Sequence, residues 1–206
     1  MNQKFFELSL EKQQAIINAA LEVFAMNDYK HAITDDIAAK AGISKGLLFY
    51  YFHNKAELYN YLFLYAKELL TKEIVNQDYY EMDDFFELLK YAAVLKYQMF
   101  KKNPYLYLFS VKVIKYSYLD EAKEIQKIIT EYSQTVFKDY FMHINFQKFR
   151  EEINPKDIMD ILLWTGEGYM YELQLKGQTL DIDDIMRQFE KWIDFFKKIA
   201  YKEEFQ

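Results

Sequence analysis

Residues 41–52, AGISKGLLFYYF, gather the side chains of this chain that are best suited to binding a polyanion. Ser44 and Lys45 supply a hydroxyl and an ammonium, and Gly46 leaves space for the close approach of a partner. Aromatic rings follow at residues 49–51, and the stretch contains no acidic residue. Small, hydroxyl and cationic residues at the start of a helix are the groups that contact phosphates and base edges.

Two short helices are predicted on either side of a glycine turn at this point of the chain. Thr34 is expected to cap the first helix, with Asp35 and Asp36 in its first turn near the positive end of the helix dipole. Gly42 suits a left-handed turn residue, and Ser44 is expected to cap the second helix. A helix, a three-residue turn and a second helix form a helix-turn-helix motif, whose second helix enters the major groove of DNA.

The flanking sequence also predicts helices. Apolar residues at helical spacing indicate a helix from about Ser9 to Asn27, and Asn54 with Glu57 forms a capping box for a helix that runs to about Val75. Five glycines and two prolines are too few for the frequent turns of a strand-rich fold. The sequence therefore predicts an all-α protein of about nine helices.

Helix starts continue to the end of the chain. Asn103-Pro104 and Asn154-Pro155 each combine a capping residue with proline at the first helical position, and Asp181 opens a last helix. No Gly/Ser-rich linker interrupts this pattern. We expect a three-helix helix-turn-helix domain at residues 1–58 and a larger helical domain at residues 59–206, joined by a continuous helix.

Composition limits the classes of function. The net charge of −6 argues against nucleic acid when taken alone, but between residues 37 and 56 the only charged side chains are Lys40, Lys45 and Lys55. The absence of cysteine and of a signal peptide favours the cytoplasm, and no apolar run approaches the roughly 18–20 residues of a membrane span. The histidines stand apart and no nucleophile-base pair or phosphate loop is present, so we expect no metal, no cofactor and no enzyme.

The segment from Thr34 to Leu58, TDDIAAKAGISKGLLFYYFHNKAEL, closely resembles the DNA-binding domain of TetR-family transcriptional regulators. The family pattern runs roughly T, then D/E-I-A, A-G-V/I-S, G, L-Y, Y/H-F and K. The motif and the helix before it cover about the first 60 residues, and the rest resembles the family only in length and helical character. One departure is Phe49, where the family usually has tyrosine, so a hydroxyl that resembles a phosphate donor is missing.

The resemblance implies double-stranded DNA as a partner. The DNA-binding residues that it predicts are Thr34, Ser44, Lys45, Gly46, Leu47, Phe49, Tyr50, Tyr51 and Lys55. Leu48 and Phe52 are expected in the core, and the three rings at residues 49–51 are expected to lie exposed along the phosphate wall and the groove.

Two expectations concern the remainder of the chain. Its aromatic residues suit either ordinary core packing or a cavity for a small molecule, with Glu167 available to a cationic group. The predicted cavity residues are Phe100, Phe109, Tyr132, Trp164 and Glu167. The last two helices carry apolar residues on more than one face, which favours packing against a second copy of the chain.

Together these observations predict a homodimeric, ligand-responsive regulator, most simply a repressor that binds a palindromic operator and is released by a small lipophilic or aromatic effector. The alternative is a helical carrier or interaction protein in which the helix-turn-helix is only structural.

Overall fold

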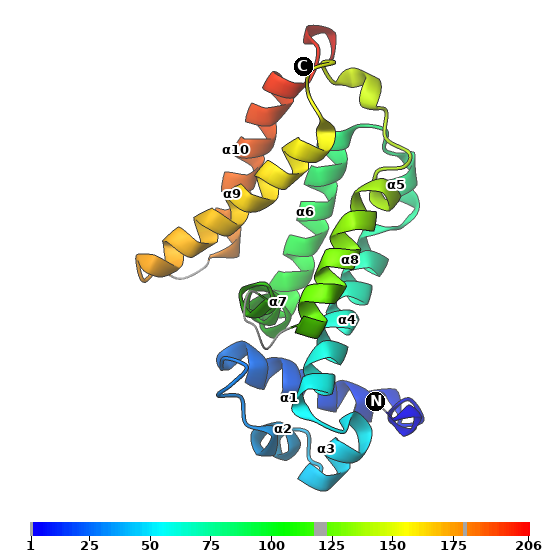
Figure 1. Ribbon diagram of the computed structural model, residues 1–206, viewed down its shortest axis with the longest axis vertical. Helices are drawn as coiled ribbons and strands as arrows, with labels where there is room; N and C mark the ends of the chain where they lie inside the picture. Colours follow the sequence, from blue (N-terminus) through cyan, green and yellow to red (C-terminus); the bar gives the residue numbers. More distant parts are fainter. Residues whose placement is uncertain (1, 118–122, 179–180) are drawn as a thin grey trace. The chain divides into compact units, whose positions relative to one another are not determined.

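The computed structural model of the chain describes residues 2–117, 123–178 and 181–206. Every regular element in these ranges is helical, which confirms the all-α class. In chain order (Figure 1) the elements are η1 (Gln3–Phe5), α1 (Leu10–Met26), α2 (Thr34–Lys40), α3 (Lys45–Phe52), α4 (Lys55–Ile74), α5 (Gln77–Glu81), α6 (Phe85–Lys102), α7 (Pro104–Ser117), α8 (Lys123–Tyr140), η3 (Phe146–Lys148), α9 (Pro155–Leu175), α10 (Ile182–Ala200) and η4 (Glu203–Phe205).

The chain divides into two compact units. The first unit comprises Met1–Thr71 and Phe100–Tyr132, and the second comprises Lys72–Met99 and Ser133–Gln206. The predicted domain boundary between residues 58 and 59 falls within α4 and stays a prediction. The predicted helix through this point is continuous from Lys55 to Ile74.

Side-chain caps set most helix starts in the first unit. The Ser9 hydroxyl accepts from the amide of Lys12 at 3.4 Å, and the Asn54 side-chain oxygen accepts from the amide of Glu57 at 2.8 Å. Both caps were predicted. The prediction for α2 was wrong by one residue, because Thr34 is the first helical residue and the extended Ile33 occupies the capping position without a side-chain hydrogen bond.

The turn between α2 and α3 is held by backbone geometry. Gly42 has a φ of 68°, the left-handed conformation that the sequence predicts for it, and the amide of Ile43 donates to the carbonyl of Ala38 at 3.0 Å. Ile37 and Leu48, from the two helices, are buried. The turn and the shared core fix α3 relative to α2.

Aromatic residues join α1, α4 and α7 within the first unit. The Tyr59 ring lies edge-on to Phe24 at 4.9 Å and to Phe109 at 5.1 Å between centroids. Such edge-to-face contacts are favourable for rings beyond the area that they bury.

The second unit has its own aromatic core. Phe86 and Phe149 both lie edge-on to Tyr201 and stack on each other, and an isolated β-bridge pairs Phe149 with Tyr201. The bridge fixes the segment after η3 to the end of α10, and α9 packs on α10. None of the helices in the described ranges is both long and apolar enough to cross a lipid bilayer.

Candidate nucleic-acid interface

α3 has an inward and an outward face. Leu48 and Phe52 lie in the core, as the sequence predicts, and each is about 1% exposed. Gly46, Leu47 and Tyr50 are exposed on the other side of the helix, and Lys45 is exposed at its first position. The eight-residue helix therefore presents a cation, a glycine, an aliphatic side chain and a phenol on one surface.

Ser44 caps α3, and its hydroxyl proton remains available for a further hydrogen bond. Its hydroxyl oxygen accepts from the amide of Leu47 at 3.2 Å, which confirms the predicted cap. A hydroxyl has one proton to donate besides the lone pairs that accept. Ser44 can therefore hold the helix start and donate to a phosphate oxygen at the same time.

Lys45 forms an exposed ion pair with Asp35 of α2. The Lys45 Nζ lies 3.1 Å from Asp35 Oδ2, and both side chains are more than half exposed. Exposed pairs of this kind stabilise a fold by only about 0–1 kcal/mol. A phosphate can therefore replace the carboxylate as the partner of Lys45 at little cost.

Gly46 is not required by the packing of the chain itself. It is helical, and an added Cβ would meet only the Ser44 hydroxyl, at 4.0 Å. Because glycine lowers helix stability relative to alanine, a glycine without a packing reason points to close approach from outside the protein.

The aromatic segment is less exposed than the sequence predicts. Tyr50 is 50% exposed, but Phe49 is half-buried and Tyr51 is only 6% exposed. The expectation that all three rings are exposed is therefore wrong for Tyr51, whose ring packs near Phe5 with 6.0 Å between centroids. A DNA contact by Tyr51 stays a prediction.

The two remaining predicted DNA-binding residues flank the motif. Thr34 is partly buried in the first turn of α2. The Lys55 ammonium donates to the carbonyl of Lys30 at 3.2 Å and lies 4.7 Å from the centre of the Tyr29 ring. Burial lowers the pKa of Lys55. In this structure Lys55 is thus held against the loop between α1 and α2.

Residues 2–8 were not predicted to contribute to this surface. The amide of Asn2 donates to the carbonyl of Tyr51 at 2.7 Å, and the Phe5 ring is fully buried against Phe52 and Tyr61, at 4.9 Å and 5.4 Å between centroids. The adjacent phenylalanines before the Ser9 cap are the sequence feature that could have indicated this packing. The residues that Phe5 contacts lie far along the chain, so no local pattern identifies them.

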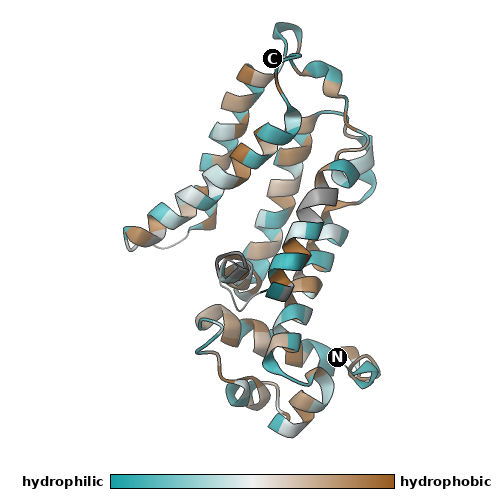
Figure 2. Ribbon diagram, viewed as in Figure 1, coloured by the Kyte–Doolittle hydropathy of each residue, from teal (hydrophilic) through white to brown (hydrophobic). Residues whose placement is uncertain are grey.

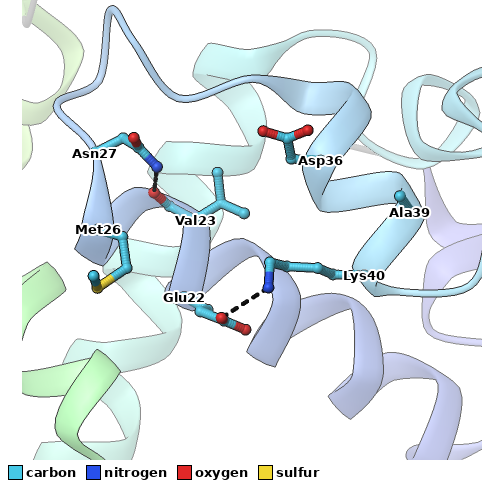
Figure 3. A pocket seen from close by; sticks show the side chains of 7 residues that line it. All are labelled: Glu22, Val23, Met26, Asn27, Asp36, Ala39 and Lys40. Atoms are coloured by element: carbon cyan, nitrogen blue, oxygen red, sulfur yellow. Dashed lines mark hydrogen bonds and ion pairs between the residues drawn. The ribbon is translucent and has the colours of Figure 1, made fainter.

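A shallow hollow of about 230 Å³ lies between α1 and α2 (Figure 3). The ion pair between Lys40 and Glu22 crosses it at 2.8 Å and ties the C-terminal end of α2 to α1. Met26 is an exposed apolar residue at its edge. The hollow belongs to the contact that braces α2.

The predicted cavity residues are divided between the two units. Phe109 is buried in the first unit, where Phe100 lies 5.2 Å from Tyr107 between ring centroids. Trp164 and Glu167 lie on α9 in the second unit, and Trp164 is 66% exposed. The Tyr132 side chain lies outside the described residues. The cavity therefore stays a prediction.

Sequence comparison finds relatives for the N-terminal part of the chain. Residues 16–62 match the family described as "Bacterial regulatory proteins, tetR family". Over 48 residues the chain is 44% identical to the HTH-type transcriptional regulator SrpR of Pseudomonas putida, a match that covers 23% of this chain and 22% of that protein. The chain thus matches less than a quarter of the length of this relative.

Structural comparison extends over most of the chain. A TetR family transcriptional regulator from Chloroflexus aurantiacus superposes with a TM-score of 0.63 and 22% identity, over 98% of this chain and 99% of that one. The fatty acid degradation regulator FadR from Bacillus halodurans superposes with a TM-score of 0.69 and 20% identity, over 87% and 96%. Residues 16–62 thus match the N-terminal domain of the tetR family, and the chain as a whole has the fold of solved TetR-family regulators.

Proposed function

We propose that this chain is a DNA-binding transcriptional regulator, a repressor that binds a palindromic operator as a homodimer and is released by a small lipophilic or aromatic effector. The observation that carries the proposal is the outward face of α3, where Lys45, Gly46, Leu47 and Tyr50 are exposed. Leu48 and Phe52 anchor the opposite face in the core, so the helix can meet a groove without unfolding.

The exposed residues suit different parts of a duplex. Lys45 and Ser44 offer charged and neutral donors for phosphate oxygens, which position a protein on DNA. Leu47 and Tyr50 lie farther along the helix, where an aliphatic chain and a phenol can contact thymine methyl groups and base edges. Gly46 lets the helix backbone approach the groove.

The net charge of −6 makes the placement of cations decisive. Neutralisation of phosphates by lysine releases counterions, so affinity falls as salt rises. Each phosphate contact lowers the logarithm of the affinity by about 0.9 for each tenfold rise in salt concentration. With few cations on this surface, we expect a shallow salt dependence and binding that is best at low ionic strength.

The surface of α9 supports a homodimer. Its exposed residues Ile161, Trp164, Gly168, Tyr171 and Leu175 recur at alternating steps of three and four, which places them on one stripe of the helix. Within the described residues a Cβ added at Gly168 would meet nothing within 4 Å, so a partner has room to approach closely.

α10, which is also in the second unit, exposes apolar residues as well. Phe195 and Ile199 are exposed one turn apart, and Figure 2 shows apolar residues interspersed along both helices. Two helices from each copy would form a four-helix bundle, as the family resemblance implies. Two-fold symmetry would then set the recognition helices about 34 Å apart, one helical turn of DNA.

An effector would act by binding two states of the dimer unequally, because a ligand with equal affinity for both shifts nothing. One solved structure with this fold is a fatty acid degradation regulator. A thermal-shift screen should therefore include long-chain fatty acids beside aromatic compounds, since a ligand of the folded state raises its melting temperature.

The direct test is selection of bound sequences from a pool of random 30-base-pair duplexes. We expect a palindromic site, bound by two chains with salt-dependent affinity. A carrier or interaction protein would enrich no sequence and would leave the duplexes free at low salt. The double variant Lys45→Ala/Tyr50→Ala should lose binding while keeping its helical circular dichroism.

A further inference from the structure

Residues 2–8 lie outside the segment that matches the family, yet they pack against α3. The buried Phe5 ring and the hydrogen bond from the Asn2 amide to Tyr51 attach the segment to the C-terminal half of α3. These two contacts hold the segment close to the helix that is proposed to enter the groove.

The segment carries an exposed cation, Lys4, between the Asn2 and Phe5 residues that attach it to that helix. The Lys4 side chain is 57% exposed, and its ammonium pairs with Glu7 at 2.7 Å. The hydrogen bond to Glu7 is the largest cause of a raised pKa for Lys4, and a smaller contribution comes from Tyr50.

Lys45 lies at the start of α3, and Lys4 belongs to the segment that is attached to the C-terminal half of the helix. Lys45 is the first residue of the helix, whereas Tyr50 lies in its last turn, and α3 itself contains no cation after Lys45. A helix in the major groove is flanked by phosphates at both ends, so a cation at the far end has a partner in the duplex.

We propose that residues 2–8 form a second DNA-contacting element, in which Phe5 holds the segment against α3 and the Lys4 ammonium contacts a backbone phosphate at the C-terminal end of that helix. The inference rests on the proposed function. Lys4 is the contact residue, and Phe5 is a positioning residue that acts through Lys4 and Tyr51. Glu7 competes with the phosphate for Lys4, because its carboxylate accepts a hydrogen bond from the Lys4 ammonium in the protein without DNA.

The test measures the affinity of the full chain for a mixed-sequence 30-base-pair duplex by fluorescence anisotropy at several salt concentrations. Lys4→Gln should weaken binding about three- to tenfold and reduce the slope of log affinity against log salt by about 0.9 per chain. Glu7→Gln should strengthen binding, because it frees Lys4 and removes a negative charge. Lys40→Gln is the matched control, since Lys40 is also exposed and ion-paired but lies at the braced end of α2.

Phe5 is tested through non-additivity. Phe5→Ala should lose as much affinity as Lys4→Gln, and adding Lys4→Gln to it should cost little more, because both remove the same contact. Phe5→Leu keeps an apolar anchor and should largely restore binding. Circular dichroism checks that each variant is folded, and the Lys4 and Glu7 variants decide the question if Phe5→Ala unfolds.

The outcomes separate this inference from the proposed function. If Lys4→Gln binds with the affinity and salt slope of the parent chain while Lys45→Gln is weakened, the segment has only a structural role and the inference is wrong. If the parent chain itself ignores the duplex at low salt, the proposed function fails, and this inference fails with it.

Discussion

Gly46 is expected to lower the stability of α3 and to favour DNA binding. It lies in α3 in a helical conformation, with open space where a side chain would be. Helix stability favours alanine at such a position, and groove contact favours glycine. The position therefore distinguishes a helix shaped for a partner from one shaped only for the fold.

Replacing Gly46 by alanine should stabilise the first unit by up to about 0.5–1 kcal/mol, because alanine has less backbone freedom to lose on folding. The same methyl group should weaken DNA binding by standing between the helix and the groove. Denaturant unfolding and duplex titration measure the two effects. Gly42→Ala is the control, because its φ of 68° makes alanine destabilising. Undiminished DNA affinity in Gly46→Ala would contradict the proposed close approach.

Asp35 offers a second test at the residue scale. It pairs with Lys45 on the proposed DNA surface, where its carboxylate both competes with phosphate and repels it. Asp35→Asn should raise the affinity for any duplex by up to about fivefold, which corresponds to the roughly 1 kcal/mol that an exposed ion pair contributes at most. Asp36→Asn removes the same charge from the next residue and should gain less. Equal gains for both variants would show that only net charge matters.

At the scale of elements, capping explains how α3 and its neighbours could be predicted. Ser9, Ser44 and Asp181 all cap the helices that the sequence assigns to them. These signals are local, because a capping side chain bonds an amide two or three residues away. The prolines at 104 and 155 likewise begin α7 and α9 as predicted.

Features that the sequence does not predict depend on contacts with distant residues or on segments too short to show a period. Tyr51 was expected on the surface, but Phe5 covers it from a segment 46 positions earlier, and no local pattern announces that contact. The phosphate contact of Lys55 stays a prediction, and in this structure its ammonium contacts the carbonyl of Lys30 and the Tyr29 ring, which are also distant in the sequence. The five-residue helix α5 was missed because it is too short to show a helical period.

The start of α6 allows a prediction about pH. Burial opposes ionisation of Asp84, but the amide of Glu87 and the ammonium groups of Lys148 and Lys197 outweigh it and lower the pKa of Asp84. A carboxyl with a lowered folded pKa stabilises the protein above its unfolded pKa of about 3.9, and this stabilisation is lost as pH falls through the folded value.

Asp84→Asn should therefore lower the free energy of unfolding by about 1–2 kcal/mol at pH 7 and have less effect at pH 3. Asparagine keeps the capping bonds to the amides of Phe86 and Glu87, so the variant removes mainly the charge. Urea unfolding at both pH values measures the difference. An equal loss of stability at pH 7 and pH 3 would exclude an ionised Asp84 as the cause.

At the scale of the whole molecule, the proposed dimer accounts for the apolar surface of α9 and α10. Trp164 is 66% exposed and belongs to the stripe that ends at Leu175. A large exposed aromatic residue on such a stripe is typical of a surface that a partner covers. Recognition of a palindromic operator depends on this proposed dimer interface, because each chain presents only one recognition helix.

Trp164→Glu should convert the dimer to a folded monomer, because a buried carboxylate without a partner is costly at an interface while the monomer already exposes this position. Sedimentation velocity measures the state. Tyr80→Glu is the control, since Tyr80 is 62% exposed on α5, outside the stripe. If Trp164→Glu sediments like the parent dimer, α9 does not form the interface as proposed.

The central claim is that the outward face of α3 binds duplex DNA. It is tested most directly by titrating a fluorescent duplex, chosen from a random pool, with the parent chain and with Lys45→Ala/Tyr50→Ala at low and moderate salt. The account predicts salt-sensitive binding by the parent and its loss in the variant, with both proteins equally helical. Equal binding by the two proteins, or no binding by the parent at low salt, would contradict it.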